Sequence, residues 1–285
     1  MKILSIYVLN FNYGKYLEQC LDSIFFSSRK YLDFVEIVLI DDNSSDNSNI
    51  IINKYKNKLD FIHINSSNLG LVKSCNNIIN MLSGQYILRI DADDYVEPDF
   101  IKYYLQEIKE NSPDIIYSDY NLVNDSGKKI SAYYKSHKSN NLEYDKPFHG
   151  AFTAIKKDFL NEINNYDEEF TRQDGYYIWI QAKINKKIIK HIKKTLFNYR
   201  QHRSSLSYDK RTLLNTRYDI NNKYLKSFVD FSSIKVIIPL ENDQFLSERI
   251  DLVNKFKILP LDFIILISEE ALMRSENKIS MAQNI

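Results

Sequence analysis

The first 100 residues alternate short apolar runs with amphipathic segments, and this alternation constrains the fold more than any other feature of the chain. It predicts strands over residues 2–9, 35–40, 61–64 and 86–90, and helices over 14–26, 46–57 and 71–81. Alternating strands and helices form a mostly parallel α/β sheet with helices on both faces. Further helices are predicted over 97–111, 157–162 and 176–185, and further strands over 115–120 and 188–199.

Polar residues follow each of the first four predicted strands. They are Asn10 and Asn12, Asp41 and Asp42, Asn68 and Gly70, and Asp91 to Asp94. Ligands of such sheets bind beyond the carboxyl ends of the strands, so we expect these clusters to share one site. The aspartates that end the segment Ile87–Asp94 repel one another unless a cation or solvent relieves them. A divalent ion bound to a phosphate-bearing donor would suit this segment, and a solvated acidic turn is the alternative for the motif taken alone.

Composition narrows the class of protein. The 285 residues can form one large core or two modest ones, and the net charge of +1 gives no indication of nucleic-acid binding. Cys20 and Cys75 are too few and too far apart for a disulfide framework or a zinc site, which predicts buried thiols in a reducing compartment. The apolar start is expected to be a strand, not a signal peptide, and no apolar run reaches the about 18 residues of a spanning helix. We expect a cytoplasmic protein, at most peripheral to the inner face of a membrane.

Several separated motifs, in order, resemble those of family 2 glycosyltransferases. They are Asn10-Phe-Asn12, Val38-Leu-Ile-Asp-Asp-Asn-Ser-Ser-Asp46, Asn68-Leu-Gly70, Asn76, Ile90-Asp-Ala-Asp-Asp94, Gln173-Asp174 and Tyr199-Arg-Gln-His-Arg-Ser-Ser-Leu-Ser207. The resemblance covers residues 1–210 and implies the GT-A fold, a nucleotide-sugar donor and transfer with inversion. Family members commonly have Glu-Asp where this chain has Gln173-Asp174.

The resemblance implies a donor site built from the strand ends. The residues expected there are Leu9, Phe11, Asn12, Asp42, Lys73, Asn76, Asp91 and Ala92. Asp42 would accept a hydrogen bond from N3–H of uracil or thymine, because a carboxylate suits an imide that only donates. Phe11 would stack on or flank the base, at a position where relatives often have Tyr. For Lys73, a solvated helix surface is the alternative to a contact with the nucleotide.

Metal and catalytic residues are implied in the same way. Asp93 would bind Mn2+ or Mg2+ directly, Asp91 would face the ribose or help orient the metal shell, and His202 would complete the site from a later loop. An exposed loop histidine is the alternative for His202. Asp94 is expected to cap the following turn. Asp174 would be the base that removes the proton of the acceptor hydroxyl, while Trp179 is expected in the core rather than against an acceptor sugar.

We predict a glycosyltransferase domain over residues 1–225, with a nucleotide-sugar half (1–100) and an acceptor half (101–225). Residues 226–285 form a C-terminal α/β appendage, with strands near 234–240 and 261–267 and a helix over 243–255. The appendage resembles the opening of a sugar nucleotidyltransferase domain without its glycine-rich loop. It is either a truncated remnant or a means of forming a homo-oligomer. The lysine-rich segment 128–145 is expected to be a solvated loop or edge hairpin rather than a lid.

The predicted activity is single addition of a sugar from a UDP-sugar or another nucleotide sugar to a hydroxyl of a glycan or lipid-linked saccharide. No Gln-x-x-Arg-Trp motif of processive synthases is present. Such an enzyme would build a surface polysaccharide such as an O-antigen, a capsule or a teichoic-type polymer. Two alternatives are a sugar-1-phosphate nucleotidyltransferase, which would need the missing glycine-rich loop, and a catalytically degenerate protein that binds glycans or nucleotides.

Overall fold

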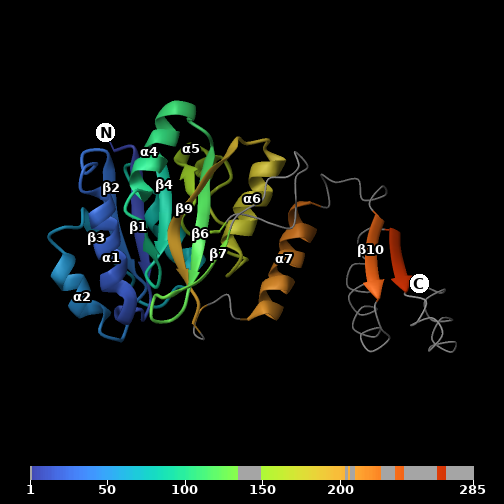
Figure 1. Ribbon diagram of the computed structural model, residues 1–285, viewed down its shortest axis with the longest axis horizontal. Coiled ribbons are helices and arrows are strands. Elements are labelled where there is room, and N and C mark those ends of the chain that lie inside the picture. The colour runs from blue at the N-terminus through green and yellow to red at the C-terminus, as the bar shows by residue number, and fades with distance from the viewer. Residues whose placement is uncertain are drawn as a thin grey trace. The chain divides into compact units, whose positions relative to one another are not determined.

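The computed structural model describes residues 2–133, 149–202, 205, 209–225, 235–240 and 262–267. The chain divides into two compact units, residues 1–220 and 221–285. The first unit contains a nine-stranded mixed sheet, in the order β3-β2-β1-β4-β8-β6-β9-β5 with β7 beside β6 (Figure 1). The prediction of an α/β sheet with flanking helices is confirmed.

The half of the sheet around β1 is parallel. Its elements are β1 (Leu4–Asn10), α1 (Gly14–Ser28), β2 (Val35–Asp41), α2 (Ser48–Tyr55), β3 (Phe61–Ile64), α3 (Leu71–Ile79) and β4 (Tyr86–Asp91). Strands β1, β2 and β4 are buried along almost their whole length, as expected for parallel strands covered on both faces. The sequence pattern predicted all seven elements, with ends shifted by a few residues.

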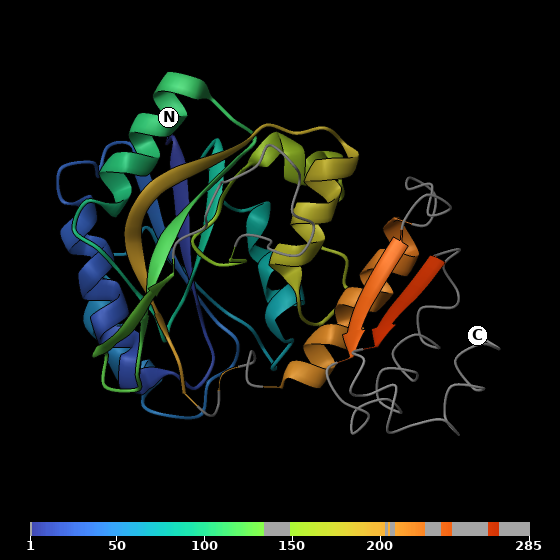
Figure 2. The same ribbon diagram turned by 45° about the vertical axis from the view of Figure 1, so that its right-hand side comes forward.

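The other half of the sheet is mixed. It comprises β5 (Tyr95–Val96), α4 (Phe100–Asn111), β6 (Ile115–Val123), β7 (Lys129–Tyr133), β8 (Ala154–Lys156), α5 (Lys157–Glu162), α6 (Asp174–Ile184) and β9 (Ile189–Arg200). Strand β8 runs antiparallel to both β4 and β6, whereas β9 is parallel to β6. The register of β6 against β9 shifts around Asp119, and such irregularities bend strands. Strand β9 is accordingly curved (Figure 2).

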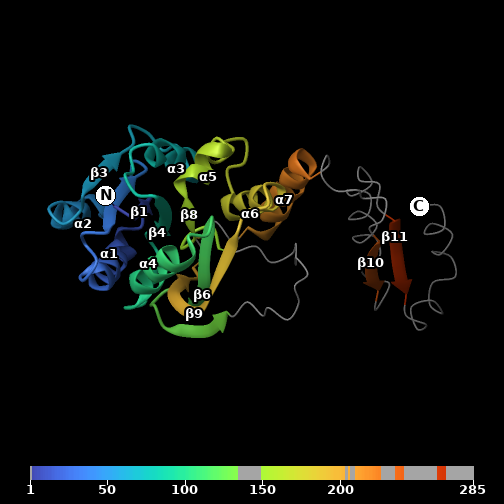
Figure 3. The same cartoon turned by 90° about the horizontal axis from the view of Figure 1, so that it is seen from above.

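Helices cover both faces of the sheet. Helices α1 and α4 lie on one face, where they pack into the main core with Leu17, Ile24, Phe100 and Tyr104, and α3 and α5 lie on the other (Figure 3). Strands β5 and β8 were not predicted, because runs of two or three residues are too short to show a period. Within the described ranges, no helix combines the length and the apolarity needed to cross a bilayer.

The remaining elements are α7 (Lys210–Tyr224), which spans the boundary between the units, and the parallel pair β10 (Lys235–Leu240) and β11 (Asp262–Ile267). Both predicted strands of the appendage are present. The helix predicted over 243–255, and the part of segment 128–145 beyond β7, lie outside the described residues. Cys20, Cys75 and Trp179 are buried, as predicted.

Candidate active site

The carboxyl ends of β1, β2 and β4 meet at one edge of the sheet. Asn10 lies opposite Asp41 in the register of β1 and β2, and Leu9 lies opposite Asp91 in the register of β1 and β4. The backbone N–H of Ala92 then donates to the carbonyl of Leu9 at 3.1 Å. The parallel register therefore places the predicted donor-site residues of three strands side by side.

The loop after β2 is closed by hydrogen bonds within the protein. Asp42 is 3% exposed, and it accepts hydrogen bonds from the backbone N–H groups of Leu69 and Gly70 and from Nδ2 of Asn65, each at 2.8 Å. Asp42 thus fixes the turn at residues 68–70, where Gly70 has a φ of +80°. Contact between Asp42 and a base stays a prediction, and it would use a lone pair of Oδ2 that no described residue occupies.

The loop after β1 is anchored to the loop after β2. The backbone N–H of Asn12 donates to Oγ of Ser44, and Oδ1 of Asn12 accepts from the backbone N–H of Ser45, both at 2.8 Å. These bonds hold Asn12 in the left-handed region, at a φ of 56°. Phe11, beside it, is 40% exposed, so its ring is available for a stacking contact.

Two predicted donor residues lie on α3 and differ in placement. Lys73 is exposed on this helix. Asn76 gives its amide to another part of the protein: Nδ2 donates to the carbonyl of Tyr166 and to Glu168, and Oδ1 accepts from the backbone N–H of Tyr166. Both amide hydrogens of Asn76 are therefore used. The residue clamps the segment that leads to α6, and its contact with the donor stays a prediction.

The end of β4 and the loop after it bring together three carboxylates, of which those of Asp93 and Asp94 are buried and that of Asp91 is partly exposed. Burial is the main reason that the pKa of Asp91 is raised to about 6; Arg89 opposes this rise, while Asp93 and Asp174 add to it. Burial, with the charges of Asp93 and Asp91, also raises the pKa of Asp94 well above its usual value. Ionisation of Asp91 and Asp94 is thus disfavoured in this loop, chiefly because burial removes them from water.

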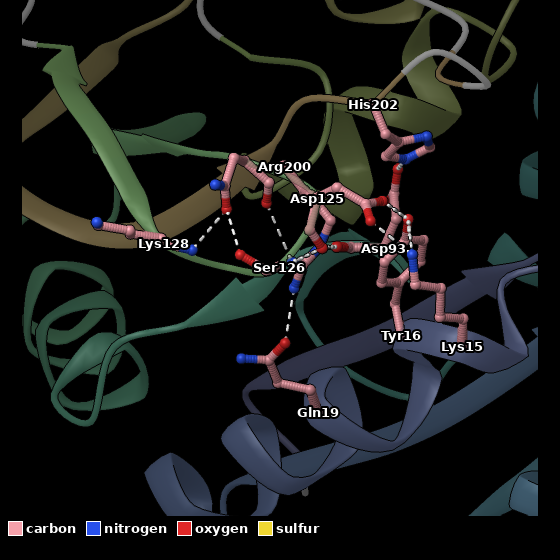
Figure 4. A network of polar contacts seen from close by, with 10 residues as sticks. Lys15, Tyr16, Gln19, Asp93, Asp125, Ser126, Lys128, Arg200 and His202 are labelled. Carbon is pink, nitrogen blue, oxygen red and sulfur yellow. Dashed lines mark hydrogen bonds and ion pairs between the residues drawn. The ribbon is translucent and has the colours of Figure 1, made fainter.

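Strand β9 ends against this loop and brings two basic side chains to it. The backbone N–H of Arg200 donates to Oδ1 of Asp94 at 2.7 Å, and its side-chain Nε donates to the carbonyl of Asp93 at 2.6 Å. The prediction that Asp94 caps the following turn is wrong, because its carboxylate holds β9 instead. The Arg200 guanidinium also donates to the carbonyls of Asn124 and Asp125 and to Gln19 of α1. Arg200 therefore joins α1, the turn after β6 and the β4 loop (Figure 4).

His202 follows two residues later and meets Asp93. Its Nε2 lies 2.8 Å from Oδ2 of Asp93, although the two residues are 109 positions apart in the sequence. The imidazole packs against the rings of Tyr13 and Tyr16, and its side chain is only 5% exposed. His202 is therefore not an exposed loop histidine, and the structure brings together the predicted pair of Asp93 and His202.

The Asp93 and His202 pair fits a divalent metal. Two neighbouring ligands of an octahedral ion with bonds of about 2.1 Å lie about 3 Å apart, close to the separation of these two atoms. Asp91, the third predicted ligand, turns to Arg89 instead, with Oδ1 at 2.8 Å from Nε. No group of three His, Cys, Asp or Glu side chains in the described part of the chain is arranged to hold an ion. Phosphate oxygens and water would have to supply the other ligands.

Asp174 begins α6 and faces the same region. Its Oδ2 accepts a hydrogen bond from Nη1 of Arg89 at 2.7 Å, and its side chain is 9% exposed. A Cβ added to Gly150 would lie 2.5 Å from the same oxygen, so only glycine allows the chain at residue 150 to pass this close.

Sequence reasoning missed Arg89, Gly150 and Arg200 as parts of this site. Arg89 had a signal, because a lone arginine inside an apolar strand must find buried partners. Arg200 lay inside a motif that was noted without a role for the residue. Gly150 had no usable signal, since its need for a hydrogen side chain comes from the approach of Asp174, which is distant in sequence.

Comparison with known proteins shows which family has this architecture. A family model described as glycosyl transferase family 2 matches residues 5–176. The chain belongs to this family. It is 27% identical over 222 residues to "Glycosyltransferase GlyA" of Streptococcus pneumoniae serotype 4, an alignment that covers 72% of this chain and 31% of the relative. It is 33% identical over 132 residues to "Poly(ribitol-phosphate) beta-glucosyltransferase" of Bacillus spizizenii, covering 45% of this chain and 20% of the relative. The chain therefore spans less than a third of the length of either relative.

A solved structure confirms the fold. S. aureus TarS 1-349 in complex with UDP superposes with a TM-score of 0.62 and 20% identity, covering 90% of this chain and 79% of that one. At this identity the likeness shows the GT-A type of fold and does not by itself transfer a substrate.

Proposed function

We propose that this chain transfers a sugar from a nucleoside diphosphate donor, a UDP-sugar, to a hydroxyl of a glycan or lipid-linked saccharide, with inversion and with a divalent metal. The observation that carries the proposal is the meeting of Asp93 and His202 in a buried site at the carboxyl ends of β1, β2 and β4. The raised pKa of Asp91, which burial and then the carboxylates of Asp93 and Asp174 cause, supports a cation in the same place. The UDP in the TarS structure supports the choice of donor.

Each residue would have a defined task. Asp93 and His202 would hold the Mn2+ or Mg2+, which when bound stabilises the negative charge of a diphosphate. Phe11 would flank the base, with Leu9, Asn12, Asp42 and Ala92 forming the floor of the donor site and Lys73 at its rim. Asp174 would accept the proton of the acceptor hydroxyl as its oxygen bonds to the anomeric carbon and the bond from that carbon to the diphosphate breaks.

The biological setting is part of the proposal. The relative that acts on poly(ribitol-phosphate) supports a role in building a surface polymer, in the cytoplasm or at the inner face of the membrane. The same proposal has three finer parts: the metal is manganese, the polymer is an O-antigen or a capsule, and the appendage forms a homo-oligomer.

Calorimetry and thermal shift with UDP, dTDP, GDP and CMP, each with and without Mn2+, test the donor site first. We expect UDP to bind in a manganese-dependent way. If none of the four binds with metal, the chain is a degenerate member of the family and the proposed activity falls.

The base is tested by Asp174→Asn in a donor-hydrolysis assay, in which water replaces the acceptor. We expect turnover to fall by about 10³-fold, since general-base catalysis contributes about 10² to 10⁴, while UDP affinity changes little. The control is Asp158→Asn, because Asp158 is also in the first turn of a helix but is exposed. Turnover retained in Asp174→Asn would refute the assignment of the base.

A further inference from the structure

Arg89 is a buried cation that contacts both functional parts of the site. It lies inside β4, is 4% exposed, and forms ion pairs with Asp91 through Nε at 2.8 Å and with Asp174 through Nη1 at 2.7 Å. The contact with Asp174 is a hydrogen bond between residues 85 positions apart, whereas the geometry at Nε is that of an ion pair without a directed hydrogen bond. One guanidinium thus joins the donor loop to the start of α6.

The charge of Arg89 is permanent, because guanidinium does not lose its proton in proteins. A buried cation of this kind must be paired. Of its two partners, Asp174 is a buried anion that in turn needs a cation, whereas the side chain of Asp91 is partly exposed. The guanidinium is planar and rigid, so a carboxylate bonded to Nη1 and another beside Nε have a nearly fixed relative position. Lysine would supply a single point charge at that place without the same geometry.

Contacts on Asp174 are restricted to one of its oxygens. Oδ2 meets Arg89 and lies against Gly150, where a Cβ would be 2.5 Å away. Oδ1 has no hydrogen-bond partner among the described residues. Rotation of the carboxylate would break the bond to Arg89, so the unpaired oxygen keeps one direction.

We propose that Arg89 is the positioning residue of Asp174, holding Oδ2 so that Oδ1 receives the proton of the acceptor hydroxyl, and fixing this oxygen relative to the donor loop through Asp91. The proposal rests on the proposed function, since it needs Asp174 as the base. Arg89 itself touches neither the donor nor the acceptor in this scheme. Its loss should therefore slow the chemical step more than it weakens donor binding.

A double-mutant cycle tests this inference on the full chain. Arg89→Met, Asp174→Asn and the double variant are compared with the unaltered protein by single-turnover donor hydrolysis, with UDP affinity in Mn2+ measured in parallel. We expect Arg89→Met to lower turnover by about 10²-fold with a change in affinity of less than about fivefold, and to have almost no further effect when Asp174 is already Asn, because residues that act as a unit are non-additive.

Other outcomes overturn the inference in distinguishable ways. If Arg89→Met causes the same fold loss with Asp174 and with Asn at position 174, the role of Arg89 is independent of Asp174. If Asp174→Asn alone retains turnover, the proposed base is wrong and the inference falls with it. Arg89→Lys covers the case in which Arg89→Met does not fold: a charge-only role predicts near-normal turnover, and a positioning role predicts a loss of at least about tenfold. Arg29→Met, on the exposed surface, is the control.

Discussion

Strands β2 and β4 each end on an aspartate and continue into a loop with two more, but different groups face the two sets of carboxylates. Asp41, Asp42 and Asp46 accept hydrogen bonds from backbone N–H groups, amides and hydroxyls, and none of them forms an ion pair with another described residue. In the β4 loop the nearest partners of Asp91 and Asp93 are Arg89 and His202, and Oδ2 of Asp94 has no partner among the described residues.

The pKa values of aspartates in the two loops shift in opposite directions. Burial would raise the pKa of Asp46, but hydrogen bonds from Ser48 and Gly14 outweigh burial and lower this pKa below its usual value. The pKa of Asp91 is raised instead, to about 6. Neutral donors arranged around a carboxylate satisfy it within the protein, whereas a cluster of buried carboxylates with too few donors favours a cation from outside. We infer that the β2 loop is chiefly structural and that the β4 loop is built to receive a ligand.

The largest expected effect is that of Asp42→Ala on stability. The carboxylate would lose three hydrogen bonds, from Leu69, Gly70 and Asn65, and hydrogen bonds to a charged group contribute about 1.5–3 kcal/mol each. We expect a loss of about 4 kcal/mol in the free energy of unfolding, at the low end of that sum because Gly70 and Asn65 keep second acceptors in Asn68 and Ser74. Urea denaturation without metal measures it, with the exposed Asp33→Ala as control. A loss below about 1 kcal/mol would mean that the β2 loop does not depend on this carboxylate.

A smaller free-energy change is expected from Asp93→Ala in the β4 loop, and it should appear in binding instead. Removing one metal ligand should weaken manganese-dependent UDP binding by about 100-fold, or about 2.7 kcal/mol. Calorimetry with and without Mn2+ measures it. The control is Asp99→Ala, because Asp99 is exposed at the start of α4 and its side chain makes no capping bond. An unchanged affinity would place the metal elsewhere and remove the contrast between the loops.

This contrast shows what the sequence could predict. Strands β1, β2 and β4 and the polar groups at their ends follow from local periodicity and parallel register, which is why the meeting of these groups at one edge of the sheet was predictable. The partners of these groups come from distant segments. Asp94 resembles a turn cap when only its neighbours are considered, but Arg200 reaches it through the ending of β9. Asn76 resembles a ligand contact, but the backbone of Tyr166 takes its amide.

Arg89 and Gly150 illustrate a second limit. A strand that is mostly apolar is correctly predicted as a strand whether or not it contains Arg89, so the pattern that predicts the element does not reveal the charge pairing. The close approach of Gly150 to Asp174 depends on packing between β8 and α6. Periodicity contains no information on such contacts between elements far apart in the sequence, which is why the candidate base was predicted and its surroundings were not.

The smallest expected effect has opposite signs in the two loops. A raised pKa means that the folded protein favours protonated Asp91, so its contribution to stability is complete below about pH 4 and is lost as the pH rises through about 6. The lowered pKa of Asp46 gives a contribution to stability that is present above about pH 4 and is lost in acid.

Metal-free Asp91→Asn should therefore be more stable than the unaltered protein near neutral pH, by about 1 kcal/mol. The raised pKa alone would allow about 3 kcal/mol, but Arg89 loses an ionic partner in this variant. Near pH 4 the difference should vanish, whereas Asp46→Asn should be destabilised near neutral pH. Urea denaturation at both pH values measures these differences. If Asp91→Asn were destabilised near neutral pH, Arg89 would already compensate the β4 loop, and the need for an external cation would no longer separate it from the β2 loop.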